Sequence, residues 1–179
     1  TSGATEANNL ALLGHARARA MKYGKSGHLI TLSTEHHSVL DPLRQLVREG
    51  FELTELRPNS DGLLSPDELE KSFKDDTFLV SIMMANNEIG VLQPLADLTR
   101  LCNTRGISFH RDAAQAFGKL SFNIDQMGID FLTISAHKIY GPKGIGALVI
   151  RQGLPILPLQ WGGKQEQGLR PGTLPIPLI

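Results

Sequence analysis

A lysine with closely spaced polar neighbours is the strongest chemical signal in this sequence. Lys138 follows an apolar stretch typical of a strand, Phe131 to Ile134, and lies between Ser135–His137 and a glycine-rich turn. An amine that is desolvated or crowded by charge loses its proton more readily and becomes a nucleophile, as Schiff-base chemistry requires. Taken alone, Lys138 is better explained as a surface lysine before a Gly-Pro turn, so the rest of the chain must decide.

A carboxylate follows residues 106–110, the apolar stretch that comes before Phe131 to Ile134 in the chain. Asp112 lies in the segment His-Arg-Asp-Ala-Ala-Gln, which ends at Gln115. A carboxylate beside a pyridine nitrogen would keep that nitrogen protonated, so that the ring accepts electrons from a substrate carbanion. The alternative for Asp112 is a helix N-cap. Gln115 could likewise complete a capping box or contact a ring hydroxyl.

Two further polar side chains come after other apolar stretches. His36 could stack on an aromatic ligand or move protons near neutral pH. By itself it is more simply explained as a loop histidine or a helix cap. Asn87 lies in the segment Asn-Asn-Glu-Ile-Gly, which is typical of a turn, although its amide could also donate to a ring oxygen.

The first residues of the chain have the composition of an anion site. Ser2, Gly3, Ala4 and Thr5 precede a helical pattern, and small residues there let backbone amides approach a phosphate. A serine or threonine before a helix is more often only a cap. Together, however, a nucleophilic lysine, an acid, a stacking histidine and an anion pocket are the parts of a pyridoxal 5′-phosphate (PLP) site. The set therefore predicts PLP as the cofactor.

The elements that must position these residues alternate along the chain. Apolar runs predict strands at 28–32, 51–56, 77–84, 106–110, 131–134 and 146–151, and helical periodicity predicts helices at 6–23, 37–49, 65–73 and 94–104. This alternation predicts an α/β fold with a mostly parallel sheet flanked by helices. Such sheets bind ligands beyond the carboxyl ends of their strands. His36, Asn87, Asp112 and Lys138 each follow a predicted strand, so we expect them to converge on one crevice.

Composition limits the remaining function classes. The chain has 179 residues, with 18 Lys+Arg and 18 Asp+Glu, a balance that argues against a general binder of nucleic acid or anionic membranes. No apolar run is long enough to cross a bilayer. Cys102 is the only cysteine, which excludes an internal disulfide and a cysteine-rich zinc site, so no metal site is predicted. It lies among apolar residues in a helical pattern, where cysteine is commonly buried and inert.

The motifs as a set resemble the cysteine desulfurases of the aminotransferase class V group, in particular the type that supplies sulfur for iron–sulfur clusters. The resemblance covers essentially the whole chain, with matching order and spacing. It is carried by residues 1–9, 34–36, 86–90, 112–115, 135–144 and 170–175.

The resemblance implies PLP-dependent fold type I, the aspartate-aminotransferase-like fold, in a homodimer whose sites lie near the subunit interface. Lys138 would hold the cofactor as a Schiff base, and His36 would stack on its ring and move protons. Asp112 would pair with the ring nitrogen, and Gln115 and Asn87 would contact the ring oxygen and nearby groups. The phosphate would be held by Ala4, Thr5, Ser135 and His137, and Thr173 would reach the phosphate of the neighbouring subunit.

The reaction implied by the resemblance converts L-cysteine to L-alanine and transfers sulfur to an enzyme cysteine, which then passes it to an iron–sulfur scaffold or another acceptor protein. In the family, that cysteine and a substrate-binding arginine lie beyond the point where this sequence stops. We therefore expect residues 1–179 to be one PLP-binding large domain, without the family's N-terminal segment and small domain and not competent for full turnover alone. The expected location is the cytoplasm, or the matrix of an organelle in a eukaryote.

Two alternatives stay open at this point. The chain could come from a related PLP enzyme, such as a selenocysteine lyase or a cystine C–S lyase, because these share the cofactor shell and differ in the substrate loop. It could also be a non-catalytic fragment that acts as a dimerising or partner-binding module.

Overall fold

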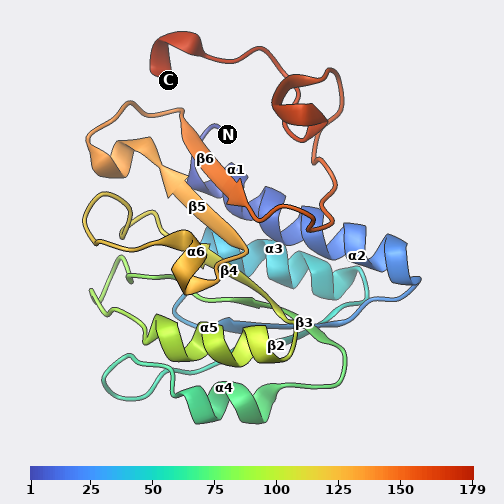
Figure 1. Ribbon diagram of the computed structural model, residues 1–179, viewed down its shortest axis with the longest axis vertical. Helices are drawn as coiled ribbons and strands as arrows, with labels where there is room; N and C mark the ends of the chain where they lie inside the picture. The colour runs from blue at the N-terminus through green and yellow to red at the C-terminus, as the bar shows by residue number, and fades with distance from the viewer.

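The computed structural model describes residues 1–179, which form a six-stranded sheet in the order β2-β1-β3-β4-β5-β6 (Figure 1). Five strands run parallel, and β6 runs antiparallel beside β5. The predicted mostly parallel α/β fold is thus confirmed. The strands are β1 (His28–Leu32), β2 (Glu52–Leu56), β3 (Thr77–Ser81), β4 (Ser108–Asp112), β5 (Phe131–Ser135) and β6 (Gly146–Ile150).

Helices precede β1 and lie between the parallel strands that follow, and the four predicted helical regions are present, whereas the short α6 was not predicted. The α-helices are α1 (Ala4–Asn9), α2 (His15–Tyr23), α3 (His37–Arg48), α4 (Pro66–Ser72), α5 (Leu95–Thr104) and α6 (Ile124–Met127). A π-helical stretch, Leu10–Gly14, joins α1 to α2, and short 3₁₀ helices span Ala136–Ile139, Gln165–Gly168 and Ile176–Leu178. No helix combines the length and apolar character needed to cross a membrane.

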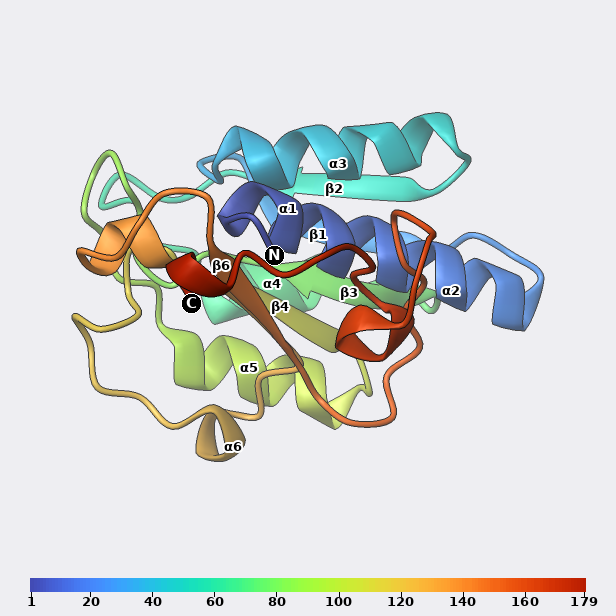
Figure 2. The same cartoon turned by 90° about the horizontal axis from the view of Figure 1, so that it is seen from above.

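Helices cover both faces of the sheet (Figure 2). The rod formed by α1 and α2 packs with α3 on one face, where Leu29 and Leu79 point. On the other face, Ile30 and Val80 meet α4 and α5 in a second apolar cluster. Neighbouring residues of one strand therefore pack into different apolar layers, because successive side chains point to opposite faces of a sheet. Burial on both faces explains why β1 and β3 are mainly apolar and show no regular polar alternation.

Two rows of polar side chains, all buried except the half-buried Thr54, link neighbouring strands of the sheet. His28 Nδ1 hydrogen-bonds Thr77 Oγ1 at 2.7 Å and His28 Nε2 hydrogen-bonds Thr54 Oγ1 at 2.8 Å, which links β2, β1 and β3. Nearer the carboxyl ends, His110 Nδ1 lies 2.8 Å from Ser81 Oγ and its Nε2 lies 3.2 Å from Thr133 Oγ1. Burial lowers the pKa of His110 to about 3, so its ring is neutral.

The first helix differs from its predicted form in two ways. It begins at Ala4 instead of residue 6, and Gly3 is its N-cap, so neither Ser2 nor Thr5 caps it with a side chain. Instead, the carboxylate of Glu6 accepts a hydrogen bond from the Ser2 backbone N–H at 2.7 Å. The π-helical stretch ends at Gly14, where a Cβ atom would lie 2.6 Å from the Leu157 carbonyl oxygen. Glycine at this position lets the C-terminal segment pack directly on the helix.

The C-terminal segment, residues 151–179, returns along the first helix. Leu157 N–H donates to the Gly14 carbonyl at 3.1 Å, and His15 Nδ1 lies 2.8 Å from the Pro155 carbonyl oxygen. Arg170 Nε donates to Glu6 Oε1 at 2.8 Å. These contacts bring the end of the chain beside the start of α1, near the carboxyl edge of the sheet.

Candidate active site

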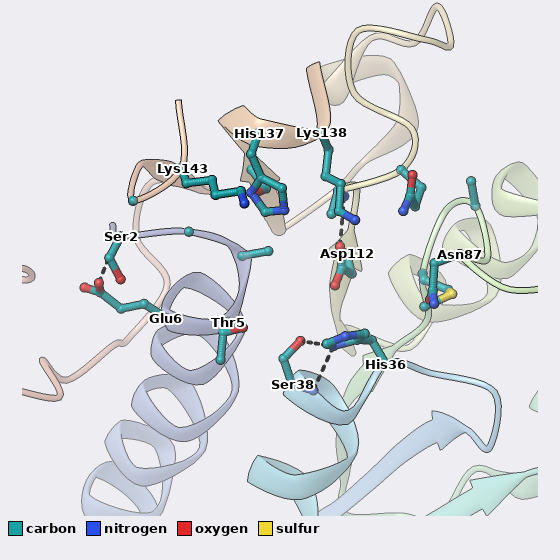
Figure 3. Close-up of a pocket in the computed structure, with 18 residues that line it drawn as sticks. Ser2, Thr5, Glu6, His36, Ser38, Asn87, Asp112, His137, Lys138 and Lys143 are labelled. Carbon is teal, nitrogen blue, oxygen red and sulfur yellow. Dashed lines mark hydrogen bonds between the residues drawn. The ribbon is translucent and has the colours of Figure 1, made fainter. Parts of the chain in front are cut away.

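A cavity of about 450 Å³ opens at the carboxyl edge of the parallel strands (Figure 3). Its size falls within the range of small-molecule sites. The predicted convergence is confirmed, because residues that follow β1, β3, β4 and β5 all line it. Of the predicted site residues, the cavity contains Ala4, Thr5, His36, Asn87, Asp112, Gln115, Ser135, His137 and Lys138.

Asp112 forms part of the buried floor of the cavity. It is the last residue of β4 and is 6% exposed. Its Oδ1 accepts from the Ala114 backbone N–H at 2.9 Å, and its Oδ2 accepts from Asn8 Nδ2 at 2.8 Å. Residues 114–119 form turns, so the alternative of a helix N-cap is wrong. The two donors fix the carboxylate in one orientation at the strand end.

His36 combines two of the interpretations considered for it. It is the N-cap of α3, where its Nδ1 accepts from the Ser38 backbone N–H at 3.0 Å. The Ser38 hydroxyl lies 2.8 Å from the same nitrogen. The ring is exposed and lines the cavity, so the capping bond orients a side chain that is also available to a ligand.

Lys138 lies on the 3₁₀ helix that follows β5. Ser135, which is buried, holds the ring of His137 through an Oγ–Nδ1 contact of 2.9 Å. The Lys138 side chain itself is exposed, so of the two routes to a nucleophilic amine, desolvation and charge crowding, desolvation does not apply in this structure. The helix ends at Tyr140 in a left-handed conformation with φ of 65°, which is uncommon for a residue with a side chain.

The start of the first helix forms the side of the cavity opposite Asn87 (Figure 3). Gly3, Ala4 and Thr5 line this side. Gly146 of β6 lies so close that a Cβ there would come within 2.6 Å of the Gly3 Cα atom. The glycine therefore lets β6 position the helix start, where backbone N–H groups favour an anion.

A turn after β3 presents Asn87 to the cavity. Asn86, which is buried, organises this turn: its Oδ1 accepts from the backbone N–H groups of Glu88 and Ile89 at 2.8 and 3.0 Å. Asn86 thus performs the turn chemistry and leaves the exposed Asn87 side chain free to line the cavity. Gln115 reaches the cavity from the turns after β4 and accepts from Lys119 Nζ at 3.0 Å.

The cavity also contains residues that sequence reasoning missed. Lys143 adds a second amine beside His137, and its place in the Gly-Pro-Lys-Gly turn could have signalled it. Nothing in the sequence pattern signals Ser38, Met83 or Glu6. The backbone N–H of Met83 donates to Glu35 Oε1 at 2.8 Å. This hydrogen bond lowers the pKa of the Glu35 carboxyl, but burial outweighs it and raises that pKa well above its ordinary value.

Two residues lie apart from the cavity. Thr173 is exposed and does not line it, and its predicted contact with a neighbouring subunit stays a prediction. Cys102 is fully buried in α5, where burial raises the pKa of its thiol to about 12. That environment agrees with the interpretation of Cys102 as an inert core residue.

The chemistry of the lining residues fits PLP. An amine, a fixed carboxylate, an imidazole and two carboxamides surround one cavity, and a helix start with nearby lysine and serine side chains supplies an anion site. These are the protein groups that a pyridine ring with a phosphate, an oxygen and a reactive carbonyl carbon needs. No group of three or more histidine, cysteine, aspartate or glutamate side chains is arranged to hold a metal ion.

Solved structures place this fold in a known class. A "NIFS-LIKE PROTEIN" superimposes with a TM-score of 0.94 and 42% identity over 99% of this chain and 48% of its own length. A structure described as "SspA in complex with cysteine" superimposes with a TM-score of 0.93 and 46% identity over 99% of this chain and 51% of that protein. The fold is the fold type I architecture of PLP-dependent enzymes.

Sequence comparison gives the family. The model described as "Aminotransferase class-V" matches residues 1–173, and the chain belongs to that family, whose members depend on PLP. "Cysteine desulfurase, mitosomal" of Trachipleistophora hominis is 51% identical over 100% of this chain and 41% of its own length. "Cysteine desulfurase IscS" of Ehrlichia chaffeensis is 51% identical over 99% of this chain and 43% of its own length. The chain thus spans less than half the length of these relatives.

Proposed function

We propose that this chain is the PLP-binding part of a cysteine desulfurase, which converts L-cysteine to L-alanine. In the whole protein, the sulfur atom of the substrate would pass to an enzyme thiol, so that a thiol becomes a persulfide and the carbon skeleton leaves as alanine. The observation that carries the proposal is the convergence of Lys138, Asp112 and His36 on one cavity, in a chain 51% identical over its full length to a protein named cysteine desulfurase.

The cavity residues would share the work of holding the cofactor. Lys138 would hold it covalently through Nζ. Asp112 would pair with the ring nitrogen, since both of its oxygens are already oriented by N–H donors. Gln115 and Asn87 would contact the ring oxygen. The phosphate would be held by Ala4, Thr5, Ser135 and His137, with Thr173 reaching across from a second subunit of a homodimer.

When bound, PLP supplies an electron-accepting ring that stabilises negative charge at the α carbon of an amino acid. The protein's part is to orient and to move protons. His36 would lie against the ring, and its Nε2, on the side of the imidazole away from the Ser38 contacts, would exchange a proton with the substrate. The exposed Lys138 amine has the freedom to take up and return the α proton.

The sulfur acceptor would be a scaffold protein for iron–sulfur clusters or another acceptor protein. We place the enzyme in the cytoplasm or in the matrix of an organelle, in keeping with relatives named as mitosomal and mitochondrial.

A substitution of Lys138 tests the cofactor assignment. The whole protein should show a visible absorption band, and borohydride should remove that band and fix the cofactor to the peptide containing Lys138. Lys138→Ala should lose both signals, whereas Lys25→Ala, at an exposed turn, should keep them. A band retained by Lys138→Ala would overturn the assignment.

A substrate assay separates the desulfurase from related enzymes. The whole protein should release sulfide from L-cysteine in the presence of a reductant, with alanine formed in equal amount. Preference for cystine or selenocysteine would instead identify a C–S or selenocysteine lyase, and inactivity of a PLP-loaded protein would favour a non-catalytic module.

A further inference from the structure

Asn8 connects two groups of the site from a position behind the cavity. It lies in the second turn of the first helix and is fully buried. Its Nδ2 donates to Asp112 Oδ2 at 2.8 Å and to Ser38 Oγ at 2.9 Å. A carboxamide nitrogen has two N–H groups, so both donors of Asn8 are used, one for each wall residue.

The hydrogen bonds at Ser38 have one consistent direction. Because the Ser38 oxygen accepts from Asn8, its own proton is free to point toward His36 Nδ1, 2.8 Å away. The same Nδ1 accepts from the Ser38 backbone N–H at 3.0 Å. A nitrogen that accepts from two donors carries no proton, so the neutral His36 ring carries its proton on Nε2.

The orientation of the Asn8 amide is also determined by its surroundings. The opposite orientation would place Oδ1 against the Asp112 carboxylate, so that two acceptors would face each other. In the observed orientation Oδ1 is buried without a hydrogen-bond partner. An unpaired buried carbonyl oxygen costs free energy, and the amide keeps this arrangement because both of its N–H groups are paired.

We propose that Asn8 is a positioning residue that fixes the Asp112 carboxylate and, by orienting the Ser38 hydroxyl toward His36 Nδ1, reinforces the ring tautomer that carries its proton on Nε2. One buried amide thereby orients the group expected to meet the ring nitrogen of PLP and the group expected to move a proton, a consequence that rests on the proposed function. The neighbouring Asn9 provides a matched control, because its Nδ2 donates only to the Thr5 carbonyl in its own helix, at 2.9 Å.

The first test measures the His36 tautomer without cofactor. In ¹⁵N-labelled protein freed of PLP, with the His36 signal assigned by its loss in His36→Gln, the neutral ring should be the Nε2–H form. Asn8→Leu, which has similar size but no hydrogen-bonding group, leaves the Ser38 hydroxyl free to turn away from Nδ1, so the share of the Nδ1–H form should rise, although the Ser38 backbone N–H still favours Nε2–H. Asn9→Leu should match the unchanged protein. An Nδ1–H ring in the unchanged protein overturns the proposal, even if Asn8→Leu does not fold.

The second test measures PLP affinity. Loss of a hydrogen bond to a charged carboxylate should raise the dissociation constant of PLP about tenfold or more in Asn8→Leu, with little change in Asn9→Leu. Circular dichroism checks that both variants fold. A folded Asn8→Leu protein with unchanged tautomer and affinity also overturns the proposal. If the unchanged protein bound no PLP, the proposed function would fail, while the tautomer result would still decide the role of Asn8.

Discussion

The two walls of the cavity are built in opposite ways. On one wall, Ser38 of α3 and Asp112 of β4 are buried and are joined by hydrogen bonds from Asn8 of α1, which lies buried behind them. On the other, Lys138 and Lys143 extend from the turn segment of residues 136–144, which starts with a 3₁₀ helix, and both are exposed and without hydrogen bonds to other side chains (Figure 3). The buried wall has its geometry before any ligand arrives, whereas the turn keeps its amines free to react or to move.

The difference separates two demands on one site. A group that must stay in place for charge stabilisation benefits from fixed neighbours, because a preorganised dipole needs no rearrangement during reaction. An amine that must form and break a covalent bond cannot be held by permanent partners. We therefore expect substitutions in the buried wall to affect geometry and those in the turn to affect attachment and long-range attraction.

The largest effect is expected at Asp112. Asp112→Asn keeps the shape of the side chain but removes its charge, so the ring nitrogen of PLP would no longer be held protonated. We expect the cofactor to stay attached to Lys138 while exchange of the substrate α proton slows by about a hundredfold or more. Proton exchange in D₂O, followed by NMR, measures this. An unchanged exchange rate would exclude the role, and Asp125→Asn, on the exposed surface of α6, is the control.

A smaller effect is expected from Ser38→Ala, which removes the hydroxyl between Asn8 and His36. The backbone N–H of residue 38 remains, so the cap of α3 persists. We expect PLP affinity to fall about tenfold. The loss should be similar at low and high salt, since buried interactions are little screened. Ser33→Ala, at an exposed position after β1, should bind PLP normally.

Lys143→Gln should have a weaker and salt-dependent effect. The Lys143 amine is exposed, and its attraction for a phosphate acts through solvent. We expect PLP affinity to fall about threefold at low salt and to match the unchanged protein at high salt. Lys164→Gln is the control. If the loss of PLP affinity persisted at high salt, Lys143 would act through a fixed and poorly screened contact, as the buried wall does. The proposed difference between the two walls would then be wrong.

The smallest effect concerns acid stability at the start of α1. Burial would raise the pKa of Glu6, but hydrogen bonds from Arg170 and Ser2 outweigh it and lower the pKa from 4.5 to about 2. The stabilisation is therefore complete above pH 4.5 and is lost as the pH falls toward about 2. Glu6→Gln should flatten the decrease in unfolding free energy across this range. Pepsin should also cleave the C-terminal segment sooner, whereas Glu88→Gln should behave as the unchanged protein.

Much of this arrangement could be predicted from the sequence. Apolar runs locate the strands, and the polar residues after them locate the carboxyl edge, because parallel strands end on the same side of a sheet. Asp112 and Lys138 are found this way. The end of β3 is less well predicted: residues 82–84 are as apolar and buried as a strand, yet β3 ends at Ser81.

The hydrogen bonds of the buried wall could not be predicted, because Asn8 and Ser38 look like ordinary helix residues. Asn8 and Asp112 are 104 positions apart and meet only in the folded chain. Ser38 follows two histidines and has no pattern of its own. The exposure of Lys138 was also hidden, since an apolar strand just before a residue does not report what covers that residue.

The polar row that includes His110 has a further consequence for how the sheet assembles. Its contacts with Ser81 and Thr133 are satisfied in one alignment of β3, β4 and β5. Sliding one strand by a single residue would leave buried polar atoms unpaired and would displace a strand end by about 3.3 Å. The row thus makes the native register of the strands the one of lowest free energy, and with that register it fixes where Asp112 and Lys138 lie at the strand ends.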